Sequence, residues 1–303
     1  MSAVQKLFPA MGTVHAVTVE GKDALSAAGQ IKEQVLTMDR LWSVFRQDSE
    51  ISALNRGEKI SAGEDTLCIL REGVRLSGET GGAFDMTVGT LTKLWRQAMR
   101  QGTVPNRRQI DEALRHTGAH GVRVSCERVK LKKGLSVDLG GIAKGYALDR
   151  ATELLKRSGV HQAILNFGGT VGAIGEPVRI GVRNPFDPDG MPMGTLVLNN
   201  RCAVTSGSYE RCADIGGRRI HHIIDPRTGY PSESDLVSVT LVGKNATALD
   251  AFATGVFVLG TDRAMPLLLK SGIEAVFVKK NGEVRITDGL RNTFQFHADV
   301  HTA

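Results

Sequence analysis

Apolar residues recur along this chain with the two periods that distinguish strands from helices. Strict alternation over residues 13–20 predicts an opening strand, and the spacing of Ile31, Val35 and Met38 predicts an amphipathic helix over residues 22–42. The same patterns predict helices over residues 65–82, over 96–116 with a break at Pro105, over 246–259 and over 262–270. Strands are expected over residues 122–131, 163–174, 178–182, 194–198, 203–205, 219–224, 236–242, 275–279 and 284–287.

Strands and helices follow one another in mixed order, and many connections are short enough for hairpins. No regular alternation of strand and helix is present, so the pattern favours an α+β fold with mixed, largely antiparallel sheets and flanking helices. The 303 residues can bury a large core, and they contain no internal repeat and no low-complexity linker. We therefore expect residues 1–303 to form one domain with two lobes.

The composition excludes several classes of protein. The net charge is +6, but the basic residues are scattered without a long run or interleaved aromatic residues, which disfavours binding to nucleic acid. The four cysteines are far apart and form no C-x-x-C pair, so neither a zinc site nor a disulfide framework is indicated. Free thiols are compatible with a reducing compartment.

No stretch of about 18 apolar residues is present, so no membrane-spanning segment is expected. The first residues lack the pattern of a signal peptide, which favours a cytoplasmic protein for the chain as given. A periplasmic location is the alternative if a leader has been removed.

The strongest chemical signal is S-V-D-L-G-G-I-A-K-G-Y-A over residues 136–147. It predicts a strand, a turn at Gly140 and Gly141, and then a helix. Free backbone N–H groups at the start of that helix would face one point and could bind phosphate, with Lys144 beside them. The alternative is an ordinary tight turn with a surface lysine.

A second signal is A-L-D-A-F-A-T-G, in which Asp250 and Thr254 stand four residues apart and so share one face of a helix. A carboxylate and a hydroxyl are oxygen ligands of the kind that Mg²⁺ prefers. The alternative is that Asp250 complements the helix dipole and Thr254 bonds back to its own turn.

Two more glycine-rich stretches are candidates for ligand contact. Residues 166–172 place a glycine pair directly after a strand, where a ligand could approach closely or the chain could simply bend. Residues 81–89 place Asp85 between apolar residues, where its carboxylate could bind a sugar or a ring edge, or where the segment could be a helix end and a turn.

Residues 221–231, H-H-I-I-D-P-R-T-G-Y-P, place two histidines at the end of a strand before a tight turn. Adjacent residues of a strand point to opposite faces, so at most one histidine should serve a given site. A hairpin link at Gly216 and Gly217 would bring the Thr-Ser-Gly loop at residues 205–207 near this segment. Hydroxyl, imidazole and carboxylate groups would then lie in one neighbourhood.

Eight stretches, taken in order from residue 11 to residue 260, resemble the ApbE family of FAD:protein FMN transferases. They are MGT, DSEISALNR, GAFDMTVG, VDLGGIAKGYALD, LNFGG, VTSGSYER, HHIIDPRTGYP and ALDAFATGVFVLG. The resemblance implies that FAD binds in a cleft between two lobes with Mg²⁺ at its pyrophosphate. It also implies transfer of FMN to a Thr or Ser hydroxyl of an acceptor flavoprotein, with release of AMP.

By the family pattern, Asp250 and Thr254 are the side-chain ligands of Mg²⁺, and Gly141 supplies a backbone carbonyl. His222 is the base that accepts the proton of the acceptor hydroxyl, a role that suits a near-neutral pKa. Asp225 orients His222 or holds the turn.

The resemblance also implies the residues that contact FAD. Lys144 is a counter-charge to phosphate, and Asp138 flanks the glycine turn on its other side. The flavin and adenine contacts of the family correspond to Met11, Phe45, Ala83, Phe84 and Asp85.

Three positions depart from the family pattern, and two rival activities stay open. Met86 and Thr90 replace prolines, and Thr170 replaces an acidic residue, which puts acceptor preference in doubt. One rival is an FAD pyrophosphatase that uses water as the nucleophile. The other is a non-catalytic FAD-binding protein, which would need neither a metal nor a base.

Overall fold

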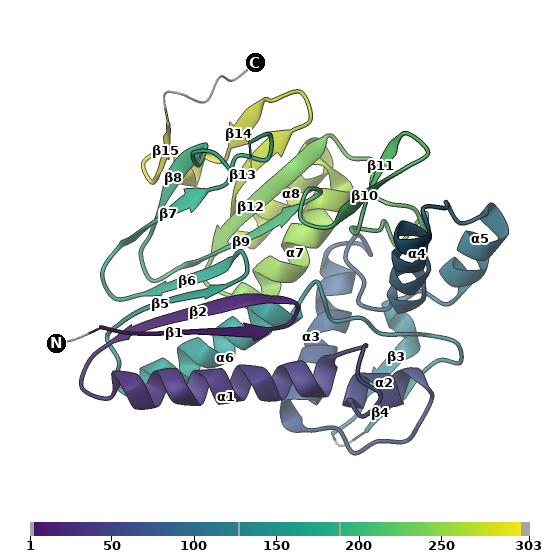
Figure 1. Cartoon of the computed structure of the whole chain (residues 1–303), viewed down its shortest axis with the longest axis horizontal. Coiled ribbons are helices and arrows are strands. Elements are labelled where there is room, and N and C mark those ends of the chain that lie inside the picture. Colours follow the sequence, from purple (N-terminus) through teal and green to yellow (C-terminus); the bar gives the residue numbers. More distant parts are fainter. Residues whose placement is uncertain (1–2, 127, 188, 298–303) are drawn as a thin grey trace.

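The computed structural model describes residues 3–126, 128–187 and 189–297, and its largest element is an eight-stranded sheet with the strand order β1-β2-β5-β6-β9-β12-β13-β14 (Figure 1). Every ladder in this sheet is antiparallel. The strands are β1 (Ala3–Ala10), β2 (Thr13–Glu20), β5 (Gln162–Phe167), β6 (Thr170–Ile174), β9 (Cys202–Gly207), β12 (Leu236–Gly243), β13 (Glu274–Lys279) and β14 (Val284–Ile286).

Helices cover one face of this sheet and continue beyond its end. Helices α1, α6 and α7 pack against the strands, and α2 to α5 lie beyond them, at the right in Figure 1. The helices are α1 (Ala24–Trp42), α2 (Glu50–Asn55), α3 (Glu64–Glu79), α4 (Gly89–Gln101), α5 (Arg107–Arg115), α6 (Ala143–Arg157), α7 (Ala246–Leu259) and α8 (Thr261–Ser271), with short 3-10 turns at Ala119–Gly121 and Asp288–Leu290.

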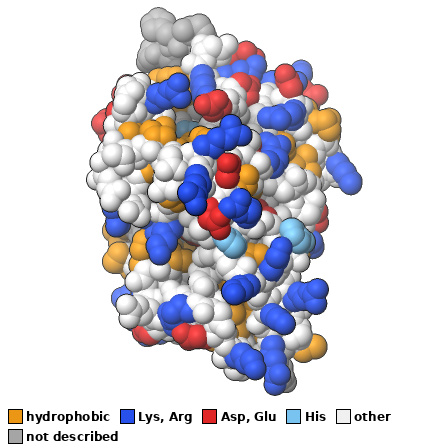
Figure 2. Space-filling view, turned by 90° about the vertical axis from the view of Figure 1, so that its right-hand side faces the viewer, with side chains coloured by type: hydrophobic (Ala, Val, Ile, Leu, Met, Phe, Trp, Pro, Cys, Tyr) orange, Lys and Arg blue, Asp and Glu red, His pale blue; other side chains and the backbone are white. Residues whose placement is uncertain are grey.

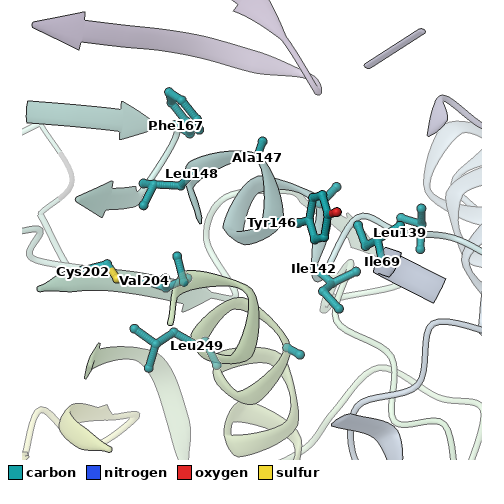
Figure 3. Packing of buried hydrophobic residues seen from close by; sticks show 14 of the residues in the cluster. Ile69, Leu139, Ile142, Tyr146, Ala147, Leu148, Phe167, Cys202, Val204 and Leu249 are labelled. Atoms are coloured by element: carbon teal, nitrogen blue, oxygen red, sulfur yellow. The ribbon is translucent and has the colours of Figure 1, made fainter. Parts of the chain in front are cut away.

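The main hydrophobic core lies between the sheet and these helices. Figure 3 shows Leu148 of α6 and Leu249 of α7 packed toward Phe167 and Val204 of the sheet. Each of these side chains is almost fully buried, and burial of one such side chain contributes about 1.5–3 kcal/mol. The same core extends to α3, as expected if residues 1–303 form one domain. That domain organisation stays a prediction.

Three smaller sheets complete the described residues. A three-stranded sheet, β15-β8-β7, packs on the other face of the large sheet and encloses a second core. Its strands are β7 (Val178–Val182), β8 (Gly194–Leu198) and β15 (Phe294–Phe296), and the two hairpins are β3 (Val122–Val124) with β4 (Val129–Leu131), and β10 (Cys212–Ile215) with β11 (Arg218–His221). The α+β class and the predominance of antiparallel pairing are as expected.

Helix boundaries follow local signals. Helix α4 ends at Gly102, whose φ of 68° is the left-handed conformation that glycine adopts easily, and α5 begins after the predicted break at Pro105. Asn106 caps α5 and forms a capping box with Gln109. The start of α7 is fixed by a residue of α6, because the Asp149 carboxylate accepts hydrogen bonds from the first N–H groups of α7.

The structure corrects the predicted strand before the glycine turn at residues 140 and 141. This apolar segment forms no strand: Val137 instead donates to Asn55 Oδ1 at 2.7 Å and accepts from Asn55 Nδ2 at 2.9 Å. On one side of this segment a side-chain amide therefore takes the place of a neighbouring strand, and on the other side the segment bonds to the backbone of residues 86–89.

Other strand predictions need adjustment. The single strand expected over residues 163–174 is a hairpin, β5 and β6, that turns at Gly168 and Gly169, both with positive φ. Residues 205–207 are part of β9 rather than a loop, and the strand expected over residues 219–224 ends at His221.

The cysteines form no disulfide among the described residues, and the helices described are too short or too polar to span a membrane. Among the described residues all four cysteines are free; Cys202 is buried, whereas Cys212 is only half-buried. None of the described helices is both long enough and apolar enough to cross a membrane.

Candidate active site

Helices α6 and α7 cross at Gly145, and this crossing builds the centre of the candidate site. A Cβ atom at Gly145 would lie 2.1 Å from the carbonyl oxygen of Ala246, so only glycine permits the approach. Gly145 N–H donates to Asp250 Oδ2 at 2.9 Å, and Lys144 Nζ lies 3.5 Å from Asp250 Oδ1. Asp250 is 3% exposed, so the site contains a buried carboxylate held by one cation and one N–H group.

The three residues expected to bind Mg²⁺ meet at this point. The Thr254 hydroxyl, one helical turn after Asp250, donates to the Asp250 carbonyl oxygen at 3.4 Å, which is the back-bond that the alternative interpretation predicts. A Cβ atom at Gly141 would lie 3.1 Å from Thr254 Oγ1, so the glycine turn lies against this hydroxyl. Carboxylate, hydroxyl and backbone carbonyl are all oxygen donors, and that set fits Mg²⁺.

This donor set contains only one ionisable side chain. Across the described ranges no three His, Cys, Asp or Glu side chains gather as a metal site. A cation here would therefore need further oxygen atoms from a bound substrate or from water, as Mg²⁺ commonly has. Binding of Mg²⁺ by Gly141, Asp250 and Thr254 stays a prediction.

The glycine turn offers fewer free N–H groups than the sequence suggested. Four N–H groups at the turn and in the first turn of α6 already donate within the chain, those of Gly140, Ile142, Ala143 and Gly145. The expected phosphate cradle of free backbone groups is corrected accordingly. Positive charge at this end of α6 comes chiefly from the Lys144 side chain.

The two histidines face opposite sides, as strand geometry predicts. His221 is buried, its Nε2 lies 3.0 Å from the carbonyl oxygen of Ser232, and its ring stands edge-on to Phe257. The His222 ring lies on the other side, with Nδ1 3.3 Å from the carbonyl oxygen of Arg211. Only His222 is placed to act outside the core.

The charge state of His222 is set by its surroundings. Burial lowers the pKa of His222 from 6.5 to about 4, and the positive charges of Arg211 and Lys144 act in the same direction. The pKa is thus lower than the near-neutral value expected from the sequence. The ring is neutral at pH 7 and can accept a proton.

Asp225 holds the turn after these histidines. Its carboxylate accepts hydrogen bonds from Arg227 Nε at 2.8 Å and Nη2 at 2.7 Å. Burial alone would raise the pKa of Asp225, but the contacts with Arg227 outweigh it and keep that pKa below its usual value. The geometry assigns Asp225 to the turn, while the ring of His222 is next to Arg211.

The other residues expected to contact FAD fall into two groups. In the first, Arg96 lies 4.6 Å above the ring of Phe45, which is 70% exposed, and Arg96 Nη2 lies 3.5 Å from Asp138 Oδ2. One face of the Phe45 ring is therefore covered by a guanidinium group. An exposed aromatic ring of this kind can stack on a flat ligand ring.

The second group is more enclosed. Ala83 and Phe84 are buried, and the Phe84 ring packs against Gly141. The Asp85 carboxylate accepts hydrogen bonds from the N–H groups of Thr87 and Ala119 and from the Thr87 hydroxyl, so its oxygen atoms are already used by the chain.

Met11 lies at the tip of the first hairpin, and a cavity lies elsewhere, beside Asp85. Met11 has a φ of 50° and donates its N–H to Asp39 Oδ1 at 3.0 Å, which fixes the turn between β1 and β2. A cavity of about 500 Å³ lies between residues 81–85 and the turn after the histidines, and Asp85, Pro226 and Arg227 help to line it. FAD contacts of Met11, Phe45, Ala83, Phe84, Asp85, Asp138 and Lys144 stay predictions.

Asn55 and Asp149 lie within stretches that resemble the family, but nothing in the sequence showed how these residues, Asp39 or Arg96 position the site. Asn55, Asp39 and Asp149 each bond to backbone atoms of distant segments, and Arg96 reaches Phe45 and Asp138 from another element. Only the folded chain brings these partners together.

Comparison with known proteins identifies the family. Residues 11–277 match the ApbE family over most of the chain. The chain belongs to the ApbE family. A member from Salmonella typhimurium named FAD:protein FMN transferase is 32% identical over 294 residues, with 90% of this chain and 83% of that protein covered. A member of the same name from Treponema pallidum is 31% identical, with 92% of this chain and 85% of that protein covered.

Solved structures of ApbE proteins share the fold. The crystal structure of the ApbE protein from Thermotoga maritima matches with a TM-score of 0.87 at 32% identity, covering 95% of this chain and 98% of that chain. The flavin transferase ApbE from Vibrio cholerae matches with a TM-score of 0.86 at 27% identity, covering 96% of this chain and 99% of that chain.

Proposed function

We propose that this ApbE protein transfers FMN from FAD to a Thr or Ser hydroxyl of an acceptor flavoprotein in an Mg²⁺-dependent reaction. The acceptor oxygen attacks the phosphorus of the FMN half, a phosphoester bond forms, and the bond to the AMP phosphate breaks. AMP leaves, and the proton of the acceptor hydroxyl passes to a base. The names of the relatives support the flavin chemistry.

The observation that carries the proposal is the convergence of oxygen donors, cations and a neutral imidazole at one place. Lys144 pairs with Asp250 and Thr254 lies beside Gly141, while the positive charge of Lys144 helps to lower the pKa of His222. A pyrophosphate substrate requires charge neutralisation, and an attacking hydroxyl requires a proton acceptor. Both requirements have a candidate within the site.

Each of the site residues then has a role in the reaction. Asp250, Thr254 and Gly141 would hold Mg²⁺, which when bound would neutralise charge on the pyrophosphate. Lys144 supplies a counter-charge at the first turn of α6. His222 receives the proton of the acceptor hydroxyl, because its ring is neutral and faces away from the core.

The test is a direct transfer assay. The purified protein is mixed with FAD, Mg²⁺ and an acceptor flavoprotein domain that contains a target Thr, with a matched domain carrying Val at that position. We expect mass spectrometry to show FMN attached to the Thr domain only, with release of AMP.

Two other outcomes would contradict the proposal. Free FMN and AMP, with no modified domain for two different acceptor sequences, would identify an FAD pyrophosphatase. Tight binding of FAD without any cleavage would identify a non-catalytic FAD-binding protein.

A further inference from the structure

Arg211 lies directly opposite His222 at the open end of the β10–β11 hairpin. The register pairs Cys212 with His221, so the next pair outward is Arg211 with His222. The His222 N–H donates to the Arg211 carbonyl oxygen at 3.1 Å, which fixes this pairing. Side chains of directly opposed residues share one face of an antiparallel pair, so Arg211 and His222 project to the same side.

The Arg211 guanidinium reaches across to the turn between β1 and β2. A Cβ atom at Gly12 would lie 2.8 Å from Arg211 Nη2, and Gly12 has a φ of 76°. Glycine at this position thus meets the backbone requirement of the turn and leaves room for the guanidinium. Arg211 therefore connects the hairpin that carries His222 with the tip of the large sheet next to Met11.

Arg211 has no acidic partner among the described residues. Two other basic side chains of the candidate site are paired, Lys144 with Asp250 and Arg227 with Asp225. No ion pair of the described residues includes Arg211, and its side chain is exposed. Figure 2 shows the face of the molecule that carries α4, α5 and the β10–β11 hairpin, with Lys and Arg side chains spread over it.

The site needs such a cation for a diphosphate ligand. Most N–H groups at the start of α6 donate within the chain, and the Lys144 ammonium is shared with the Asp250 carboxylate. An unpaired guanidinium beside His222 has five N–H donors in a planar arrangement that matches phosphate oxygens.

We propose that Arg211 binds the diphosphate group of FAD and holds it next to His222. This inference rests on the proposed function, and it adds a substrate-binding residue on the hairpin to the residues of α6 and α7. Its N–H groups would neutralise charge on the phosphate oxygens during the transfer. The chemistry recognised is that of a dinucleotide diphosphate rather than of the flavin ring.

The test compares binding of FAD and of riboflavin, which has the same ring system without phosphate. Binding is measured by flavin fluorescence with wild-type protein, Arg211→Gln, Arg211→Lys and Arg218→Gln. Arg218 lies at the turn end of the same hairpin, so its variant removes the same charge without touching the site. Thermal unfolding of each variant checks that the fold is kept.

We expect Arg211→Gln to weaken FAD binding by about 10- to 100-fold, the usual effect of losing a hydrogen-bonded charge. Riboflavin binding should be unchanged, Arg211→Lys should recover part of the loss, and Arg218→Gln should bind FAD like the wild type. FAD affinity within twofold of wild type in Arg211→Gln would overturn the inference, as would an equal loss for riboflavin. Failure of the wild-type protein to bind or cleave FAD would instead overturn the proposed function.

Discussion

His15 provides a test of how the core beneath the site responds to pH. Its side chain lies on β2, is 0% exposed and is flanked by the rings of Phe8 at 5.4 Å and Phe167 at 4.6 Å. Neither ring nitrogen forms a hydrogen bond of ordinary geometry with any residue that the structure describes. Burial lowers the pKa of His15 from 6.5 to about 4, and the charge of Lys144 acts in the same direction.

The direction of the effect follows from the two pKa values. The unfolded chain takes up a proton at His15 as the pH falls below 6.5, whereas the folded protein does not do so until about pH 4. The contribution of neutral His15 to the free energy of unfolding is thus fully present above pH 6.5 and is lost as the pH falls toward 4. A tenfold change in proton affinity corresponds to about 1.4 kcal/mol, so the full loss is about 3 kcal/mol.

The perturbation is His15→Phe, which removes the titrating ring and keeps an aromatic side chain between Phe8 and Phe167. Urea unfolding from about pH 7.5 to about pH 4.5 should show a steeper loss of the free energy of unfolding in the wild type. The expected extra loss in the wild type is about 2.5 kcal/mol over this range. His221 and His222 are present in both proteins and cancel in the difference.

The test compares how steeply the free energy of unfolding changes with pH in the two proteins. A constant difference in that free energy between them does not affect the test. Phe is larger than His, so overpacking can shift the free energy of unfolding by about 1–3 kcal/mol at every pH. His161→Phe, a change at an exposed position, is the matched control. Parallel curves for wild type and His15→Phe would refute the reasoning that burial keeps this ring neutral.

Three further predictions concern the crossing of α6 and α7 and the base. Asp250→Asn should melt like the wild type but lose Mg²⁺-dependent FAD cleavage, since the carboxylate charge is removed; full activity across an Mg²⁺ titration would contradict the metal assignment. His222→Ala should bind FAD in a fluorescence titration but transfer FMN about 10²- to 10⁴-fold more slowly. An unchanged transfer rate would refute the role of His222 as the base. Gly145→Ala should lower the melting temperature, because the added Cβ would lie 2.1 Å from the Ala246 carbonyl oxygen, and relief of such overpacking costs about 1–3 kcal/mol. That cost exceeds the gain of about 1 kcal/mol in helix propensity, so a raised melting temperature would show that the helices separate easily.

Helical periodicity is a local property, so the sequence predicted several helices, although the helix expected from residue 96 begins at Gly89. The expected and observed limits agree within two residues for α1 and coincide for α7. Strands were harder, since pairing depends on distant segments. β1 was missed because its Lys6 and Pro9 weaken the pattern, and Pro9 is tolerated because β1 is an edge strand.

The placement of Asp250 and Thr254, two of the predicted Mg²⁺ ligands, was predictable from local spacing, whereas their role as metal ligands comes from the resemblance to the family and stays a prediction. Asp250 and Thr254 share a helix face by their spacing alone, and the structure places Gly141 beside Thr254. Proximity of Lys144 to Asp250 could not be predicted from local patterns, because it depends on how α6 and α7 cross at Gly145. The number of free N–H groups at the glycine turn was overestimated, since the sequence does not show that those of Gly140, Ile142, Ala143 and Gly145 already have partners.

The polar residues within the recognised stretches divide by the partners that they have in the fold. Asp85, Asp225 and Asn55 each bond to the backbone or to a neighbouring side chain, so their polar atoms stabilise the segments that surround the site. Within the part of the chain that the structure describes, Arg211 and His222 keep polar groups that are free or only partly used. The stretches that resemble the family contain both kinds of residue. The two kinds of residue differ in their hydrogen-bond partners. By this criterion Arg211, like His222, has polar groups that are available to a substrate.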